Sequence, residues 1–166
     1  MATSTEVAIA TTTLGSAASS ITFSSIPSTY TDLRVVVVGK QSGAGNYAGL
    51  RFNGDTATNY SITTLWGTGA GAYSARDIND TNMFYQWNGV TTSTIPVFHT
   101  VDIFSYAGST YKTSLFTVSQ DTNGGTSVDR VVGLWRSTSA INSLTFMFNG
   151  SDTWSAGTTA TLYGIL

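Results

Sequence analysis

The sequence lacks the residues on which many catalytic and metal sites depend. None of its 166 residues is cysteine, which excludes disulfides, thiolate nucleophiles and cysteine-ligated metals. It contains one histidine, His99, so a site built from two or three histidines cannot form within one chain. Because His99 lies in the middle of a predicted strand, we interpret it as a side chain packed within or beside a sheet.

Charged residues are also scarce, at 10% of the chain against about a quarter in an average globular protein. The sequence has no cluster of lysine and arginine, so we expect no nucleic-acid partner. No stretch approaches 18 uninterrupted apolar residues, and we expect no membrane span. The opening residues lack the basic and apolar regions of a signal peptide. These absences favour a soluble protein made in the cytoplasm.

Hydroxyl and aromatic residues, by contrast, are abundant. Serine and threonine fill roughly three positions in ten, and aromatic residues make up 12% of the chain. Disordered chains are poor in aromatic and β-branched residues, whereas strands are rich in them. The composition therefore predicts a folded protein made mainly of strands.

The pattern along the chain predicts an all-β fold. Apolar residues recur at every second position, turn residues interrupt them at short intervals, and no 3.6-residue period is present. The predicted strands lie at residues 5–13, 21–23, 33–40, 48–52, 60–66, 83–87, 96–106, 111–120, 130–136, 141–148 and 158–166. We predict an antiparallel β-sandwich of about ten to twelve strands with essentially no helix, and we favour a jelly-roll variant. The expected division is an N-terminal strand or arm at 1–20 and one sandwich domain at 21–166.

Some segments carry sharper expectations. Residues 132–136, 141–148 and 158–166 have large apolar side chains and are predicted to be central strands of the core. The run from Val35 to Val38 predicts a strand buried on both faces. Asn53-Gly54 and Asn88-Gly89 are strong turn signals, because both residue types tolerate positive φ. Residues 67–71 and 77–82 are predicted loops.

We find little that indicates chemistry. Most of the nine carboxylates lie at predicted turns, although two of them facing each other across a cleft would suit a glycosidase. Asp77, Asn79 and Asp80 offer oxygen ligands for calcium without the EF-hand spacing. The glycines at 67, 69 and 71 are not followed by a predicted helix and lack a Gly-Lys-Ser/Thr sequence. We predict no enzymatic activity, no cofactor and no metal.

Tryptophans are the stronger candidates for binding. Trp66, Trp87 and Trp154 are possible contacts for a protein partner or a glycan, because an exposed indole stacks on sugar rings or anchors an interface. The alternative for each is an ordinary place in the core. Trp154 lies in the predicted loop before the last strand, and we expect it to be the most exposed.

Five segments resemble small virion proteins of tailed bacteriophages, which occur as head or tail components and as modules of fibre proteins. The segments are FSSIPSTYTDLRVVV (23–37), LRFNGDTATNYS (50–61), YKT (111–113), GLWRSTSAINSLTF (133–146) and WSAGTTATLYGIL (154–166). They are spread along the chain from residue 23 to residue 166. The resemblance implies an all-β structural module of the virion without known catalysis.

Within that family two roles remain open. A capsid decoration, or cement, protein would bind the outer face of the major capsid protein lattice, and we expect it to self-associate as a homotrimer. This role is favoured because the sequence has no repeats, coiled coil or collagen-like shaft. A tail-fibre or receptor-binding module would instead recognise host surface glycan through its tryptophans. Either protein would be made in the host bacterial cytoplasm and reside in the virion.

Overall fold

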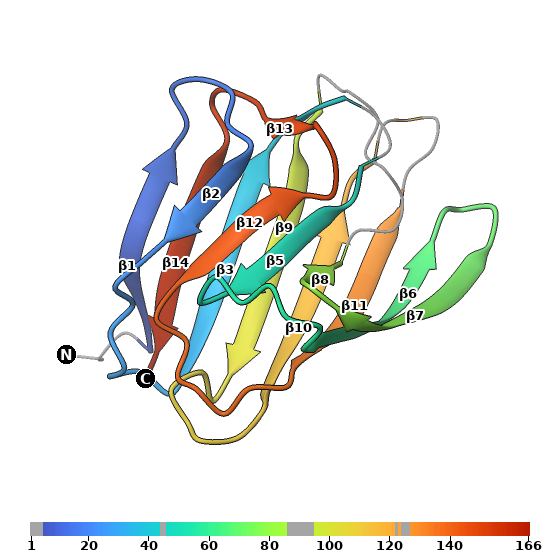
Figure 1. Cartoon of the computed structure of the whole chain (residues 1–166). Helices are drawn as coiled ribbons and strands as arrows, with labels where there is room; N and C mark the ends of the chain where they lie inside the picture. Colours follow the sequence, from blue (N-terminus) through green and yellow to red (C-terminus); the bar gives the residue numbers. More distant parts are fainter. Residues whose placement is uncertain (1–4, 44–45, 86–94, 122, 124–126) are drawn as a thin grey trace.

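The computed structural model describes residues 5–43, 46–85, 95–121, 123 and 127–166, which form antiparallel sheets and contain no helix (Figure 1). The strands are β1 (Glu6–Thr13), β2 (Ser20–Phe23), β3 (Asp32–Gly39), β4 (Gln41–Ser42), β5 (Ala48–Phe52), β6 (Tyr60–Gly67), β7 (Ala72–Asp80), β8 (Met83–Phe84), β9 (Val97–Phe104), β10 (Lys112–Ser119), β11 (Val128–Trp135), β12 (Leu144–Phe148), β13 (Thr153–Trp154) and β14 (Thr159–Ile165). Three of these fourteen described strands have only two residues. The predicted antiparallel β-sandwich is confirmed, and the jelly-roll variant stays a prediction.

Two layers make up the sandwich. The larger sheet has eight strands in the order β1-β14-β3-β9-β10-β11-β6-β7, and the smaller has four in the order β2-β12-β5-β8. The smaller sheet covers one face of the larger sheet, and β13 pairs with β4 at one end (Figure 1). The outer part of the β6–β7 hairpin extends beyond the smaller sheet.

The core lies between the two sheets and follows the alternation of each strand. In β3, Leu33, Val35 and Val37 are completely buried against the smaller sheet. Their neighbour Val36 is only partly buried, and Val38 is 41% exposed. The prediction that residues 35–38 are buried on both faces is therefore wrong, because no sheet formed by the described residues covers the second face of the large sheet.

The Asn53-Gly54 turn confirms its prediction. Both residues have positive φ, 51° and 66°, and the amide of Asp55 donates to the carbonyl of Phe52 at 2.9 Å. This turn brings the Asp55 carboxylate next to the end of β11, where it accepts a 2.7 Å hydrogen bond from the Trp135 indole. Asn88-Gly89 lies outside the described residues.

The C-terminal strands are interior strands, as predicted, but they belong to two different sheets. β11 and β14 lie in the large sheet, with β3, β9 and β10 between them, whereas β12 is paired on both sides in the small sheet. In β14, Ala160 and Leu162 face the core, and Thr161, Tyr163 and Ile165 lie on the opposite face, as the alternation predicted.

The two ends of the described chain meet. β1 pairs along its length with β14, with Glu6 opposite Ile165. Within the segment 1–20, predicted to be a strand or an arm, residues 6–13 form a strand that completes the chain's own sheet. Residues 77–80 were predicted as a loop but continue β7, and the irregularity there is a β-bulge at Asn79, whose φ is 58°.

Candidate interaction surface

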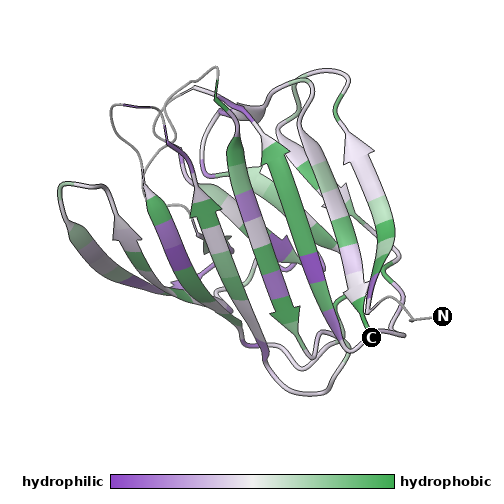
Figure 2. Ribbon diagram, turned by 180° about the vertical axis from the view of Figure 1, so that it is seen from behind, coloured by the Kyte–Doolittle hydropathy of each residue, from purple (hydrophilic) through white to green (hydrophobic). Residues whose placement is uncertain are grey.

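The uncovered face of the large sheet is the broadest feature of the surface, and we call it the outer face (Figure 2). Because opposite residues of antiparallel strands point to the same side, the register arranges its side chains in four rows running from β1 to β7. The first row is Thr13, Thr159, Val38, Phe98, Ser119, Val128, Gly67 and Ala72; the second is Thr11, Thr161, Val36, Thr100, Thr117, Arg130, Leu65 and Ser74; the third is Ala8, Tyr163, Arg34, Asp102, Leu115, Val132, Thr63 and Arg76; the fourth is Glu6, Ile165, Asp32, Phe104, Thr113, Leu134, Ser61 and Ile78. None of these residues is buried.

Large apolar side chains are scattered among hydroxyls on this face. Phe98 and Phe104 are each 42% exposed, Val132 is 50% exposed and Leu65 is 56% exposed. Single exposed apolar residues are ordinary, but a broad face that carries many of them is typical of an interaction surface.

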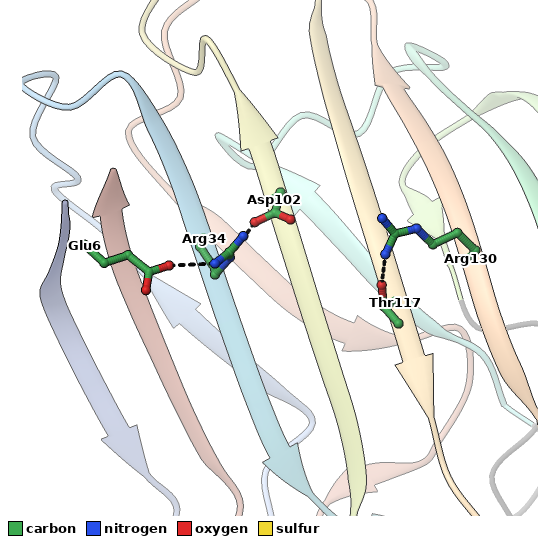
Figure 3. A network of polar contacts seen from close by, with 5 residues as sticks. All are labelled: Glu6, Arg34, Asp102, Thr117 and Arg130. Atoms are coloured by element: carbon green, nitrogen blue, oxygen red, sulfur yellow. Dashed lines mark hydrogen bonds and ion pairs between the residues drawn. The ribbon is translucent and has the colours of Figure 1, made fainter. Parts of the chain in front are cut away.

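An ion triad lies in the β1–β9 half of the outer face (Figure 3). Arg34 on β3 donates through Nε to Asp102 on β9 at 2.6 Å and through Nη1 to Glu6 on β1 at 2.8 Å. The hydrogen bond to Asp102 raises the pKa of Arg34, with the charges of both carboxylates adding to it and partial burial opposing it. All three side chains remain substantially open to solvent, so the triad contributes little to stability and instead fixes the charges in place.

In the β10–β7 half, two arginines bond to hydroxyl groups, whereas Arg34 bonds to carboxylates. Arg130 on β11 donates to the hydroxyl of Thr117 (Figure 3), and Arg76 on β7 donates to the hydroxyl of Thr63 at 3.1 Å. Neutral threonines do not balance these charges. Two shallow depressions, of about 320 and 520 Å³, flank Arg34 in the other half.

The candidate tryptophans have three different outcomes. Trp154 is 1% exposed and packs against Phe148 and His99, with ring centroids 4.6 and 5.4 Å away. The expectation that Trp154 is exposed is therefore wrong, because its short strand β13 folds over the core. Trp66 is half-buried and stacks on Tyr73 at 5.5 Å, on the part of the hairpin beyond the small sheet. Trp87 lies outside the described residues.

His99 lies in the core, as predicted. It is 1% exposed, and its imidazole meets the rings of Tyr85 and Trp154 edge to face. Burial lowers the pKa of His99 to about 3, so the ring is neutral at physiological pH. A neutral, enclosed imidazole packs as an aromatic side chain.

Two of the three suggested calcium ligands lie together. The β-bulge at Asn79 puts Asp77 and Asp80 on the same face of β7, and burial, with the charge of Asp77 adding to it, raises the pKa of Asp80. The carboxamide oxygen of Asn79 instead accepts a 2.7 Å hydrogen bond from Arg136. Within the described ranges, no group of three or more histidines and carboxylates is placed to hold a metal ion. The same ranges contain no helix long and apolar enough to cross a membrane.

The sequence did not identify the outer face as a unit. The register that brings Arg34, Asp102 and Arg130 onto one face cannot be derived from the sequence. The available signal was weak: alternate positions of residues 33–40, 96–106 and 130–136 carry one or two charges among hydroxyl and apolar residues.

The chain was compared with known proteins in two ways. No model of a known protein family matches it, and no curated protein is significantly similar to it in sequence.

Proposed function

We propose that the chain is a non-enzymatic structural protein of a tailed-phage virion that decorates the lattice of the major capsid protein. The assignment to a virion rests on the resemblance to phage virion proteins, which is carried by residues 23–37, 50–61, 111–113, 133–146 and 154–166. The fold supports a structural role, because its broad face is suited to contact with another protein. The homotrimeric state stays a prediction.

The outer face is the observation that supports this role most directly. Eight strands about 4.8 Å apart and some eight residues long span roughly 35 by 26 Å, or about 900 Å², and a standard protein interface buries about 800 Å² per partner. Little charge has to be desolvated on such a face, because most of its side chains are hydroxyl or apolar.

The fold also suits a component that must persist outside a cell. Several pairs join strands that are distant in sequence, including β1 with β14 and β3 with β9. Non-local pairing makes folding slow. An extensive paired and packed structure also gives a protein few places where it opens locally.

Copy number in the purified virion tests the proposal. A decoration protein occurs in roughly as many copies as the capsid subunits, whereas a tail component occurs in a few dozen copies at most. Quantitative mass spectrometry against the major capsid protein measures the ratio. A ratio far below one copy per ten capsid subunits would contradict decoration of the lattice.

A specific observation favours the second candidate, a tail-fibre module that binds glycan. Trp66 and Tyr73 form a stacked pair on the projecting part of the β6–β7 hairpin, and Tyr73 is 47% exposed. Adjacent aromatic faces at an exposed site suit the apolar face of a sugar ring.

Adsorption to host cells separates the two candidates. If the hairpin binds glycan, Trp66→Ala or Tyr73→Ala reduces adsorption at least tenfold, whereas Tyr111→Ala has no effect. Tyr111 is a matched control because it is 56% exposed and lies in the turn before β10. Unchanged adsorption for both hairpin variants, with folding verified by circular dichroism, would count against this candidate.

A further inference from the structure

The charges of the outer face are divided between its two halves. The β1–β9 half holds Glu6, Asp32, Asp102 and Arg34, three negative charges and one positive, for a net −2. The β10–β7 half holds Arg76 and Arg130, for a net +2. The face as a whole is neutral, with its negative and positive halves side by side. Such a face is complementary to a copy of itself turned so that each half meets the other.

One symmetry operation produces this match. A two-fold axis parallel to the strands, passing between β9 and β10, lays β1 over β7 of a second copy, β14 over β6, β3 over β11 and β9 over β10. Each row then faces the same row of the second copy. The two sheets pack as aligned layers, whose strands cross at about 30°, so the correspondence is closest near the axis.

In several rows this arrangement sets a large side chain against a small one. Near the axis, Phe98 lies over Ser119 of the second copy, and Phe104 over Thr113. The same holds two pairs of strands further out, where Tyr163 lies over Thr63, whereas Val38 lies over Val128 and Thr100 over Thr117. Alternation of large and small side chains across facing layers is what allows them to interdigitate.

No two charged residues are directly opposite, so no like charges meet. Arg34 faces Val132, and Asp102 faces Leu115, of the second copy, and the two remain paired with each other within their own chain. The larger depression is bordered by Arg34, Asp102 and Arg130, so the exposed Val132 of the second copy lies over it. The acidic edge at Glu6 comes to lie beside Arg76, one row away.

We propose that the outer face is a two-fold interface between two copies of this chain, formed by back-to-back packing of their eight-stranded sheets. This inference does not depend on the proposed virion role. It assigns to a second copy the face that we proposed for contact with the capsid lattice, so a capsid contact would then use another surface of the dimer, and it replaces the expected homotrimer with a dimer. Two faces of about 900 Å² bury an area typical of a specific interface. Closed two-fold symmetry is also the commonest arrangement of identical subunits.

The mass of the purified chain in solution tests the interface first. Sedimentation equilibrium is expected to give a dimer, and Arg76→Glu combined with Arg130→Glu is expected to raise its dissociation constant at least tenfold. These changes take the outer face from neutral to −4. The control is Arg51→Glu on β5, compared with Arg130→Glu alone. It alters the total charge equally on the small sheet and leaves dimerisation unchanged. A monomer or trimer of the unaltered chain would overturn the proposal, as would equal effects of the two charge variants.

Cross-linking tests the orientation, since the chain has no cysteine of its own. A cysteine replacing Thr100, close to the axis, lies about 10 Å from its counterpart, whereas one replacing Ser74 on β7 lies roughly 34 Å from its counterpart. A short bismaleimide is therefore expected to cross-link T100C into dimers but not S74C. Cross-linking of S74C would overturn this arrangement. Cross-linking of neither variant would also overturn it, and would be the result if the face binds a capsid protein instead of a second copy. Because both experiments use only the purified chain, their failure is distinct from a low copy number in virions.

Discussion

His99 is the chain's single histidine, and its imidazole is enclosed between the two sheets with the rings of Tyr85 and Trp154 around it. Burial in an apolar environment disfavours the charged form. The pKa is therefore lowered from 6.5 to about 3. The consequence is a link between stability and pH.

Between these two pKa values the unfolded chain binds a proton that the folded chain does not. The free energy of unfolding should therefore fall as the pH drops below 6.5, by up to about 1.4 kcal/mol per pH unit. The hydroxyl of Tyr85, whose pKa burial raises, stays neutral over this range. His99→Leu should remove the loss between pH 6.5 and about 5, above the range in which most carboxylates titrate. Urea unfolding at several pH values measures both slopes, and equal slopes would contradict the assignment.

Among the strands, β11 shows how closely the layers approach. Its Gly133 lies beneath β8, and a Cβ there would be 2.3 Å from the Met83 sulfur and 2.9 Å from the Phe116 ring. A side chain at this position would force the Met83 side chain and the Phe116 ring to shift, and would push the two sheets apart where they cannot. Glycine is therefore favoured here by packing.

Gly133→Ala is expected to destabilise the protein by about 2 kcal/mol, the usual scale of overpacking in a filled core. Gly15→Ala is the matched control, because nothing lies within 4 Å of its added Cβ; we expect a change of about 0.5 kcal/mol or less. Thermal and urea unfolding of both variants measure the difference. Similar stabilities would show that the layers can move apart at little cost.

For the whole molecule, the arrangement of the ends allows a circular permutation. The amide of Leu166 donates to the carbonyl of Thr5 at 3.1 Å, next to the Glu6–Ile165 pair. Joining these residues with an Asn-Gly linker turns β14 and β1 into a hairpin. New ends placed at Gly69 fall in the exposed loop between β6 and β7, where breaks are best tolerated.

This permutant is expected to unfold cooperatively and to fold at a rate similar to that of the original chain. The new link makes the β1–β14 pairing local, but the cut makes the β6–β7 pairing long-range. A permutant opened within β3, a strand paired on both sides, is expected not to fold. Stopped-flow refolding with circular dichroism tests both. Aggregation of the Gly69 permutant, or normal folding of the β3 permutant, would contradict the role assigned to these strands.

Much of the fold could be predicted because its signals are local. Alternation along residues 33–40 and 158–166 is set by the two-residue period of a strand, and the Asn53-Gly54 turn by the φ values that those residues tolerate. The burial of His99 also follows from its place among apolar alternate residues. By contrast, Trp154 was placed wrongly, since a short loop segment folding over the core leaves no periodic trace.

The sequence by itself determined that this chain forms antiparallel strands, where most of them lie, and which side chains alternate along each. Only the tertiary structure decided which of the two alternating faces is covered. Val35 and Val36 are the same residue type, yet one is buried and the other lies on the outer face. Strand order and register depend on pairing between residues far apart in the chain, as with Glu6 and Ile165, and local propensity carries no information about such partners. The outer face, with its divided charges, therefore exists only once those pairings are made.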